Sequence, residues 1–221
     1  MSSGEPVRAV LFDLDGTLVD SAPDLIAAVT RLCAEIGAPP PMAETVRRSV
    51  SAGGRAMLRR ALPGADDERI DTLLPRFLEL YSRGIAVHTR LYPDIGRVLG
   101  LLHDHAIPWG VVTNKPGWLA RSLLQELDLA TRCAALVCGD CLPVRKPDPL
   151  PVLRACELAG ANPGATTFVG DDLRDIEAGR AAGTRTIAAA WGYLDGGDPA
   201  TWGADRLVAR PIDLVDALGL D

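Results

Sequence analysis

Short apolar runs alternate with helical patterns along most of this chain. Short runs that are apolar nearly throughout are typical of parallel strands buried on both faces. They occupy residues 7–12, 109–112, 134–137, 166–169 and 186–190. Between them, apolar residues recur every three or four positions, which predicts helices at residues 93–105, 117–127, 148–158, 173–182 and 211–218. We therefore predict an α/β fold, a doubly wound parallel sheet with the first run as a central strand.

The segment between the first two predicted strands shows only helical patterns. Ser21 can cap a first helix, and the helical pattern then continues with breaks at residues 51–54 and 62–64. This segment is too small to be an independent second fold. We predict a core of residues 1–19 and 88–221 with a small inserted helical cap of residues 20–87.

Composition narrows the classes of function. The 221-residue chain is 48% hydrophobic and 24% charged, and its net charge is −6 without any basic stripe, which argues against nucleic-acid or anionic membrane partners. No apolar run approaches about 18 residues, and the first residues lack the basic-then-apolar pattern of a signal peptide. We expect a cytoplasmic protein that acts on a small molecule as a monomer or a weak homodimer.

The five cysteines do not suggest a disulfide framework, because their number is odd and they are scattered along the chain. Cys138 and Cys141 have CxxC spacing. However, a zinc site needs a second pair of ligands, and a redox pair normally opens a helix, whereas prolines follow here. We assign these two cysteines no chemical role.

The first predicted strand is followed by Asp13-Leu14-Asp15-Gly16-Thr17. Ligands of open α/β sheets bind beyond the carboxyl ends of the strands, so both carboxylates are expected to face one crevice. Two such charges are tolerated when a divalent cation bridges them or when one holds a proton as a general acid. Gly16 permits a tight turn, and the Thr17 hydroxyl can reach a phosphate. A surface Asx turn would explain Asp15-Gly16 alone, so the other strand ends must decide.

Polar groups also follow the next two strands. Thr113 and Asn114 end the second strand, where a hydroxyl and an amide can donate to phosphate oxygens. Lys146 follows the third strand, in a loop that Pro147 holds extended. Only two of the 23 basic residues are lysines, Lys115 and Lys146, and both adjoin these motifs. This choice suggests positions that need a compact ammonium group.

The fourth strand ends in an acidic motif. Asp171 and Asp172 are adjacent, and Asp175 follows one helical turn later, which is more carboxylate than a helix cap needs. Together with the two aspartates of the first motif, the predicted site has five carboxylates and the single ammonium of Lys146. A bound phosphate would then require a hard cation, so the sequence predicts a Mg²⁺ site with oxygen ligands.

These motifs resemble those of the haloacid dehalogenase-like superfamily, whose phosphatases carry DxDGT, a later Thr or Ser, a Lys and a GD-rich acidic motif. Here the motifs are Asp13 to Thr17, Thr113, Lys146, and Gly170 to Asp175. The resemblance covers essentially the whole chain, including the helical cap, and is greatest to the phosphoglycolate phosphatase group. Within that group, residues 109–116, 170–177 and 202–205 look most like those of N-acetylmuramic acid 6-phosphate phosphatases.

The resemblance implies Mg²⁺-dependent hydrolysis of a small, carboxylate-bearing ester, 2-phosphoglycolate or N-acetylmuramic acid 6-phosphate. Asp13 would form an aspartyl-phosphate, while Asp15 would protonate the leaving alkoxide and later activate water. Thr113 and Asn114 would bind the phosphoryl group, and Lys146 would neutralise it. The expected metal ligands are the Asp13 carboxylate, the Asp15 carbonyl and Asp171, supported by Asp172 or Asp175.

Other reactions of the superfamily fit this sequence less well. A dehalogenase needs no acid at Asp15, and a phosphonatase-type C–P hydrolase needs a cap lysine, which residues 20–90 lack. A sugar-phosphate mutase of the beta-phosphoglucomutase type shares the core motifs, so transfer of the phosphoryl group rather than its hydrolysis stays open. A non-catalytic phosphate-binding regulator is the alternative outside enzymes, and a phosphatase assay would separate it.

The cap contains one candidate for substrate recognition. Residues 51–55 interrupt the helical segment with two glycines, which let the backbone approach a ligand, and Arg55 opens the next helix. An arginine fork suits the carboxylate that both candidate substrates carry. In the alternative interpretation, Arg55 joins Arg59 and Arg60 on a solvated helix face.

Overall fold

A computed structural model describes residues 6–220 and contains a six-stranded parallel sheet with the strand order β5-β4-β1-β6-β7-β8. The strands are β1 (Ala9–Phe12), β4 (Trp109–Val112), β5 (Ala135–Val137), β6 (Thr166–Gly170), β7 (Arg185–Ala189) and β8 (Arg206–Val208). β1 lies between β4 and β6, with Phe12 opposite both Val111 and Val169. The predicted doubly wound sheet with this strand at its centre is therefore confirmed.

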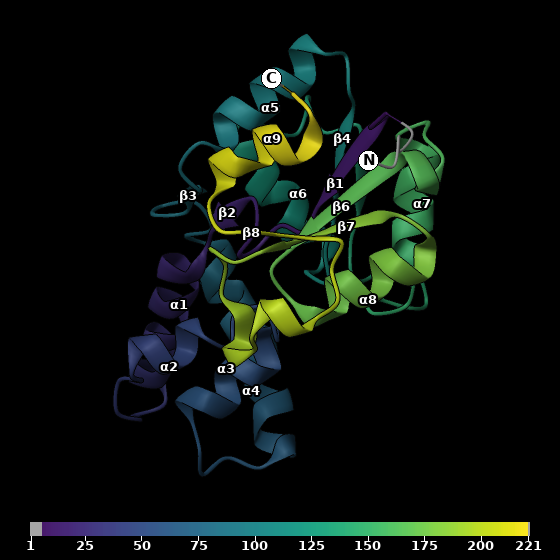
Figure 1. The fold of residues 1–221 in the computed structure, drawn as a ribbon. Helices are drawn as coiled ribbons and strands as arrows, with labels where there is room; N and C mark the ends of the chain where they lie inside the picture. Colours follow the sequence, from purple (N-terminus) through teal and green to yellow (C-terminus); the bar gives the residue numbers. More distant parts are fainter. Residues whose placement is uncertain (1–5, 221) are drawn as a thin grey trace.

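Helices cover both faces of the sheet (Figure 1). One face carries α5 (Ile95–Asp104), α6 (Gly117–Glu126) and α9 (Leu214–Leu218), and the other carries α7 (Leu150–Leu158) and α8 (Leu173–Ala182). Each helix buries its apolar stripe against the strands, as Leu119 and Leu123 of α6 do on one face and Val152 of α7 on the other. Among the described residues, no helix combines the length and apolarity needed to cross a membrane.

Three strands are absent from the prediction. β2 (Val19–Asp20) and β3 (Arg90–Leu91) pair with each other in an antiparallel ribbon, and two residues are too few to show any alternation. β8 lies at the edge of the sheet with Leu207 exposed, so its sequence has no fully buried run. A 3₁₀ turn, Pro211–Asp213, replaces the first part of the predicted last helix.

The segment between β1 and β4 forms the helical cap. Its helices are α1 (Ala22–Glu35), α2 (Ala43–Arg47), α3 (Gly54–Ala61) and α4 (Asp67–Ser82). Figure 1 shows them grouped together beyond one end of the sheet. The β2–β3 ribbon lies where the chain leaves the core and returns to it, and we define the cap as residues 20–87.

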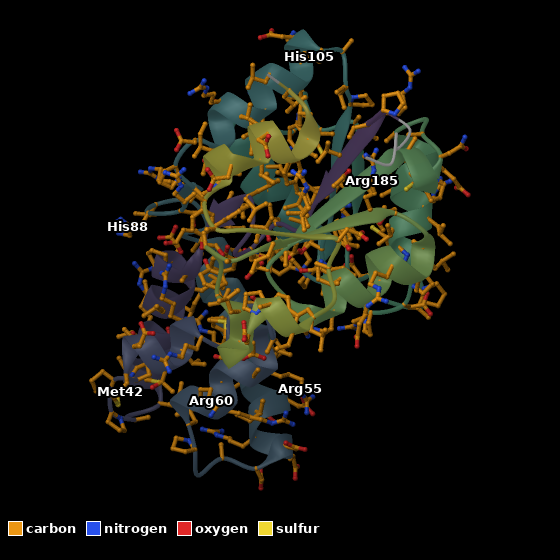
Figure 2. All side chains as sticks on the ribbon, viewed as in Figure 1. Met42, Arg55, Arg60, His88, His105 and Arg185 are labelled. Atoms are coloured by element: carbon orange, nitrogen blue, oxygen red, sulfur yellow. The ribbon has the colours of Figure 1, made fainter. Side chains whose placement is uncertain are left out.

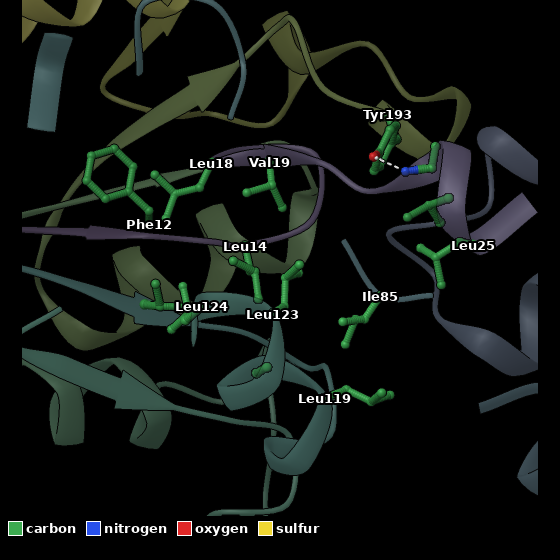
Figure 3. Close-up of a cluster of buried hydrophobic side chains, with 14 of the residues drawn as sticks. Phe12, Leu14, Leu18, Val19, Leu25, Ile85, Leu119, Leu123, Leu124 and Tyr193 are labelled. Atoms are coloured by element: carbon green, nitrogen blue, oxygen red, sulfur yellow. Dashed lines mark hydrogen bonds between the residues drawn. The ribbon is translucent and has the colours of Figure 1, made fainter. Parts of the chain in front are cut away.

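Two groups of contacts hold the cap on the core. Apolar side chains of both parts form one buried cluster, in which Leu14 and Leu18 of the core accompany Leu25 and Ile85 of the cap (Figure 3).

The second group of contacts is made by the hydroxyl of Tyr193, a residue of the core. This hydroxyl accepts the N–H of Ala22 at 2.9 Å, the bond drawn in Figure 3, and donates to the Asp20 carboxylate at 2.8 Å. The entry to the cap is therefore fixed by hydrogen bonds as well as by apolar packing.

The return from the cap is fixed by Asp24, a buried carboxylate in the first turn of α1. It accepts the backbone N–H groups of His88 and Thr89 at 2.9 and 2.8 Å and the Thr89 hydroxyl at 2.7 Å. Hydrogen bonds to a charged acceptor are stronger than neutral ones. Asp24 thus ties the segment that directly follows the cap to the beginning of the cap.

Ser21 occupies the predicted N-cap position of α1, but its side chain does not cap the helix. The hydroxyl donates instead to Asp15 Oδ1 at 2.5 Å. A carboxylate is a strong acceptor for a hydroxyl, so the predicted cap gives way to a contact with the first motif.

Candidate active site

Residues far apart in sequence meet at the carboxyl ends of the parallel strands. Asp13 follows β1, Thr113 follows β4, Lys146 lies in the loop after β5, and Asp171 follows β6. All four are buried, with exposed fractions of 7% or less. The structure therefore places one member of each predicted motif at the same edge of the sheet, as the topology of parallel strands requires.

Lys146 is held at the centre of this group by three partners. Its ammonium donates to Asp13 Oδ1 at 2.8 Å and to the Val112 carbonyl at 2.7 Å, and it lies 2.6 Å from Asp175 Oδ1. Burial opposes the charge, but the two carboxylates outweigh it and raise the pKa of Lys146. The lysine is therefore a fixed positive charge whose position is set from two strands and one helix.

Three buried carboxylates, two of which contact Lys146, lie close together at this edge of the sheet. Asp13, Asp171 and Asp175 each offer an oxygen within 4.8 Å of the others. Burial is the main cause that raises the pKa of Asp13, the pKa of Asp171 to about 7, and the pKa of Asp175 well above its usual value. Repulsion by Asp13 adds to the rise at Asp171 and Asp175, and repulsion by Asp15 adds to the rise at Asp13. Hard oxygen donors with uncompensated negative charge fit a divalent cation. The described residues thus contain a candidate metal centre.

The Asp171 carboxylate is positioned by three donors from separate segments. Thr17 Oγ1 donates to Oδ1 at 2.8 Å, while the Tyr193 N–H and the Ser51 hydroxyl donate to Oδ2 at 2.9 and 3.1 Å. A Cβ on Gly16 would lie 2.2 Å from this carboxylate, so only glycine fits that turn. Thr17 is fully buried against Asp171, a placement that differs from the substrate contact we expected because the nearby carboxylate takes its hydroxyl.

Asp15 is held from both the core and the cap. The Lys115 ammonium lies 3.0 and 3.1 Å from its two oxygens and 3.0 Å from the hydroxyl of Tyr81, a residue of α4. Asp15 and Tyr81 outweigh burial and raise the pKa of Lys115. Lys115 is not among the predicted site residues, although the scarcity of lysine in the chain points to it. The contact between Lys115 and Tyr81 of the cap could not be predicted from the sequence.

Asp172 and Asp175 share a helix cap but have different surroundings. They form a capping box at the start of α8, in which the Asp172 N–H donates to Asp175 Oδ2 at 3.2 Å. Asp172 also pairs with Arg174, at 2.7 Å from each of its oxygens, and this arginine outweighs burial and lowers the pKa of Asp172. Of the two, only Asp175 belongs to the carboxylate cluster that forms the candidate metal centre.

Arg174 links the acidic motif to the cap, which the sequence did not indicate. Its guanidinium donates to the Ser51 carbonyl at 2.8 Å, while the hydroxyl of the same serine reaches Asp171. The cap loop that begins at Ser51 therefore contacts the core through both its backbone and its side chain. Ser51 therefore takes part both in the contact between cap and core and in the positioning of Asp171.

The two glycines and the arginine of that loop have separate roles. Gly53 has φ of 86°, a conformation that favours glycine. A Cβ on Gly54 would lie 2.9 Å from Leu74, so this glycine allows α3 to pack closely on α4. Arg55 lines a cavity between core and cap but pairs with Asp71 on the cap, and Figure 2 shows it on the cap together with Arg60. Arg55 thus lines the cavity, as a substrate contact would, and is also paired on the cap, as a residue of a solvated helix face would be.

Asn114 fixes the lysine loop rather than facing solvent. Its side-chain amide donates to the Lys146 carbonyl at 3.0 Å and its carbonyl accepts the Lys146 N–H at 3.1 Å. The CxxC stretch supports this arrangement, because a Cβ on Gly139 would lie 2.2 Å from the Asn114 carbonyl oxygen, and Asp140 accepts the Gly117 N–H at 2.8 Å. The cysteines around them are both free thiols. Gly139 and Asp140 of the CxxC stretch are therefore explained by their contacts with the Asn114 loop and with the start of α6.

These groups form the floor of the cavity, which has a volume of about 330 Å³. Apart from Pro116 and Leu119, the core residues that line the cavity are polar and form its floor: Asp13, Asp15, Thr113, Asn114, Lys115, Arg145, Lys146, Asp172, Arg174 and Asp175. The roof is mainly apolar and comes from the cap: Leu25, Val50, Met57, Leu74, Phe77, Leu78 and Tyr81. The cavity has the size at which proteins bind small organic ligands.

The fold is that of a known class of hydrolases. Residues 10–189 match the haloacid dehalogenase-like hydrolase family, and the chain belongs to that family. It is 45% identical to the N-acetylmuramic acid 6-phosphate phosphatase of Pseudomonas putida over 94% of both chains, and 45% identical to the phosphoglycolate phosphatase of Xanthomonas campestris pv. campestris over 94% of both. A crystal structure of a "predicted phosphoglycolate phosphatase" from Haemophilus somnus superposes with a TM-score of 0.86 at 26% identity, covering 96% of this chain and 97% of that one.

Proposed function

We propose that the chain is a Mg²⁺-dependent phosphatase whose substrate is N-acetylmuramic acid 6-phosphate. The chain is a phosphoric monoester hydrolase of the type of its relatives, and these include enzymes named for that ester and for phosphoglycolate at equal identity. The observation that favours the sugar ester is the apolar roof over a cavity of about 330 Å³. Six apolar side chains of the cap form this roof: Leu25, Val50, Met57, Leu74, Phe77 and Leu78.

The two candidate esters differ in what they could offer this roof. Phosphoglycolate has a single methylene between phosphate and carboxylate, so it would leave most of the apolar surface facing water. N-acetylmuramic acid 6-phosphate has a sugar ring, an acetyl methyl and a lactyl methyl. Burying apolar surface contributes roughly 25 cal/mol per Å², so the larger ester gains more binding free energy from the roof. 2-Phosphoglycolate is the second candidate, on the strength of the relatives that carry its name.

The floor supplies a nucleophile and its electrostatic support. Asp13 Oδ1 accepts from Lys146, which leaves Oδ2 to attack phosphorus. The Asp13 oxygen forms a bond to phosphorus as the ester bond breaks, which gives an aspartyl-phosphate and an alkoxide. Thr113 and Lys146 stand beside the reacting carboxylate and stabilise the charge that develops on the phosphoryl oxygens.

Asp15 transfers a proton both when the aspartyl-phosphate forms and when water breaks it down. It first gives a proton to the leaving alkoxide, and its carboxylate then takes a proton from the water that attacks phosphorus and breaks the bond to Asp13. Lys115 and the Ser21 hydroxyl hold this carboxylate in one orientation at the edge of the cavity. The net reaction converts ester and water into alcohol and inorganic phosphate.

The candidate metal centre fits Mg²⁺. Asp13, Asp171 and the Asp15 carbonyl would hold the ion, with Asp175 beside them. When bound, it would offset the repulsion between the carboxylates and the phosphate and draw charge from a phosphoryl oxygen. Hydrogen bonds from Thr17, Tyr193 and Ser51 orient Asp171 for this role.

The test is release of inorganic phosphate from N-acetylmuramic acid 6-phosphate, 2-phosphoglycolate and glucose 1-phosphate, assayed side by side with Mg²⁺ and with a chelator. We expect the highest kcat/KM for the first ester and no turnover in the chelator. Conversion of glucose 1-phosphate to another sugar phosphate without phosphate release would indicate a mutase. A higher kcat/KM for 2-phosphoglycolate would transfer the assignment to the second candidate.

A further inference from the structure

The basic side chains around the cavity are paired with one exception among the described residues. Lys146 pairs with Asp13 and Asp175, Lys115 with Asp15, Arg174 with Asp172, and Arg55 with Asp71. Arg145 also lines the cavity and is exposed. Within residues 6–220 its guanidinium has no ion pair or hydrogen bond. It is therefore the cation of this cavity whose charge is available to a ligand.

The backbone beneath Arg145 is fixed. The next residue, Lys146, has both its N–H and its carbonyl bound by the Asn114 side chain, and the Arg145 carbonyl accepts the Asp148 N–H at 3.0 Å. The side chain thus extends from an anchored loop while its tip is unpaired. Such an arrangement lowers the cost of ordering the residue when an anion binds.

The two adjacent cations face the cavity at different depths. Lys146 is only 4% exposed and contacts Asp13 on the floor, whereas Arg145 is exposed. Consecutive Cα atoms lie about 3.8 Å apart, and both side chains are long, so the two charges can contact anions that are several ångströms apart. A substrate whose phosphate lies at Lys146 would meet Arg145 with a second anionic group on its far side.

We propose that Arg145 binds the carboxylate of the substrate. This inference deepens the proposed function and rests on it. In N-acetylmuramic acid 6-phosphate the phosphate and the lactyl carboxylate lie on different sides of the sugar ring, which suits two cations at different depths. A guanidinium can hold a carboxylate through two parallel hydrogen bonds. Arg145, rather than Arg55 with its partner Asp71, is then the residue that distinguishes carboxylated substrates.

The test compares two sugar phosphates that differ only in the lactyl group, N-acetylmuramic acid 6-phosphate and N-acetylglucosamine 6-phosphate. Arg145→Met should lower kcat/KM for the first about 10- to 100-fold, mainly through KM, the scale of one lost charged hydrogen-bonding pair. For the second substrate we expect a change below about 3-fold. Arg145→Lys should restore part of the loss, because it keeps the charge without the fork.

Arg132→Met is the matched control, since Arg132 is exposed just before β5 and does not line the cavity. Equal losses on both sugar phosphates, no loss on either, or a selective loss in Arg55→Ala but not in Arg145→Met would each overturn the assignment. Failure of the wild-type enzyme on both sugar phosphates is a separate result. It would contradict the proposed function and remove the basis for the Arg145 assignment with it.

Discussion

The floor and the roof of the cavity are built on different principles. Apart from the exposed Arg145, the charged groups of the floor are paired with one another, so charged hydrogen bonds set their positions. The roof is apolar, and the ion pairs of the cap that carries it, such as Arg59 with Asp67 and Arg76 with Glu35, lie on the surface. Exposed pairs contribute little. In the proposed function, the floor carries out the chemistry and the roof selects what is bound.

The largest effect should follow from Asp13→Asn on the floor. An amide cannot act as the nucleophile, so turnover should fall by more than about 10³-fold. Lys146 keeps Asp175 and the Val112 carbonyl as partners, so the fold should persist. Phosphate release and a thermal melt of the same preparation check both statements. Activity above about one thousandth of wild type would disprove the role of Asp13.

Asp15→Asn should have the next largest effect and should depend on the leaving group. General acid and base catalysis is typically worth about 10² to 10⁴ in rate, and an alkoxide needs the proton more than an aryl oxide does. We expect a larger loss in the rate of leaving-group release for N-acetylmuramic acid 6-phosphate than for p-nitrophenyl phosphate. The burst phase of each substrate measures this rate. Equal losses would mean that Asp15 is not the proton donor.

Lys115→Met tests whether the contact between floor and cap positions Asp15. A small misplacement of a reacting group costs up to about 10²-fold, so we expect kcat for the sugar ester to fall about 10- to 100-fold with a smaller change in KM. Arg83→Met, which removes an exposed cation from the end of α4, serves as the control. A change confined to KM would make Lys115 a substrate contact instead of a positioning residue.

Leu78→Ala should have the smallest effect and should act only through the roof. Leu78 lies one turn after Leu74 on α4, and both line the cavity. Loss of part of one apolar contact corresponds to about a 3- to 10-fold fall in kcat/KM for N-acetylmuramic acid 6-phosphate. Turnover of 2-phosphoglycolate should stay within about 2-fold. If both esters lose activity equally, the roof does not select between them.

The floor was more predictable from the sequence than the roof. Asp13, Thr113, Lys146 and Asp171 each end or follow a strand, and the topology of parallel strands brings those ends together. The contact between Lys115 and Tyr81 could not be predicted, because it depends on how α4 lies over the core. The contact between Arg174 and Ser51 likewise depends on how the cap lies over the core.

Contacts differed from the prediction where a hydroxyl had a choice of acceptors. The Asn114 side chain bonds the Lys146 backbone and also lines the cavity, so its expected contact with phosphate stays a prediction. Thr17 was also expected at the phosphate, yet its hydroxyl bonds Asp171. Ser21 likewise bonds Asp15 instead of capping its helix. A sequence pattern identifies the donors but not which of several nearby acceptors is closest in the folded chain.

Formation of an aspartyl-phosphate at Asp13 is the step on which the proposed mechanism depends most directly. Wild type and Asp15→Asn can be mixed rapidly with p-nitrophenyl phosphate, an ester whose leaving group needs little protonation, and quenched in acid for peptide mass spectrometry. We predict a phosphoryl group on the peptide that contains Asp13, and more of it in Asp15→Asn, because breakdown by water needs the Asp15 base. A p-nitrophenol burst without phosphorylation of that peptide, or phosphorylation of another residue, would contradict the mechanism.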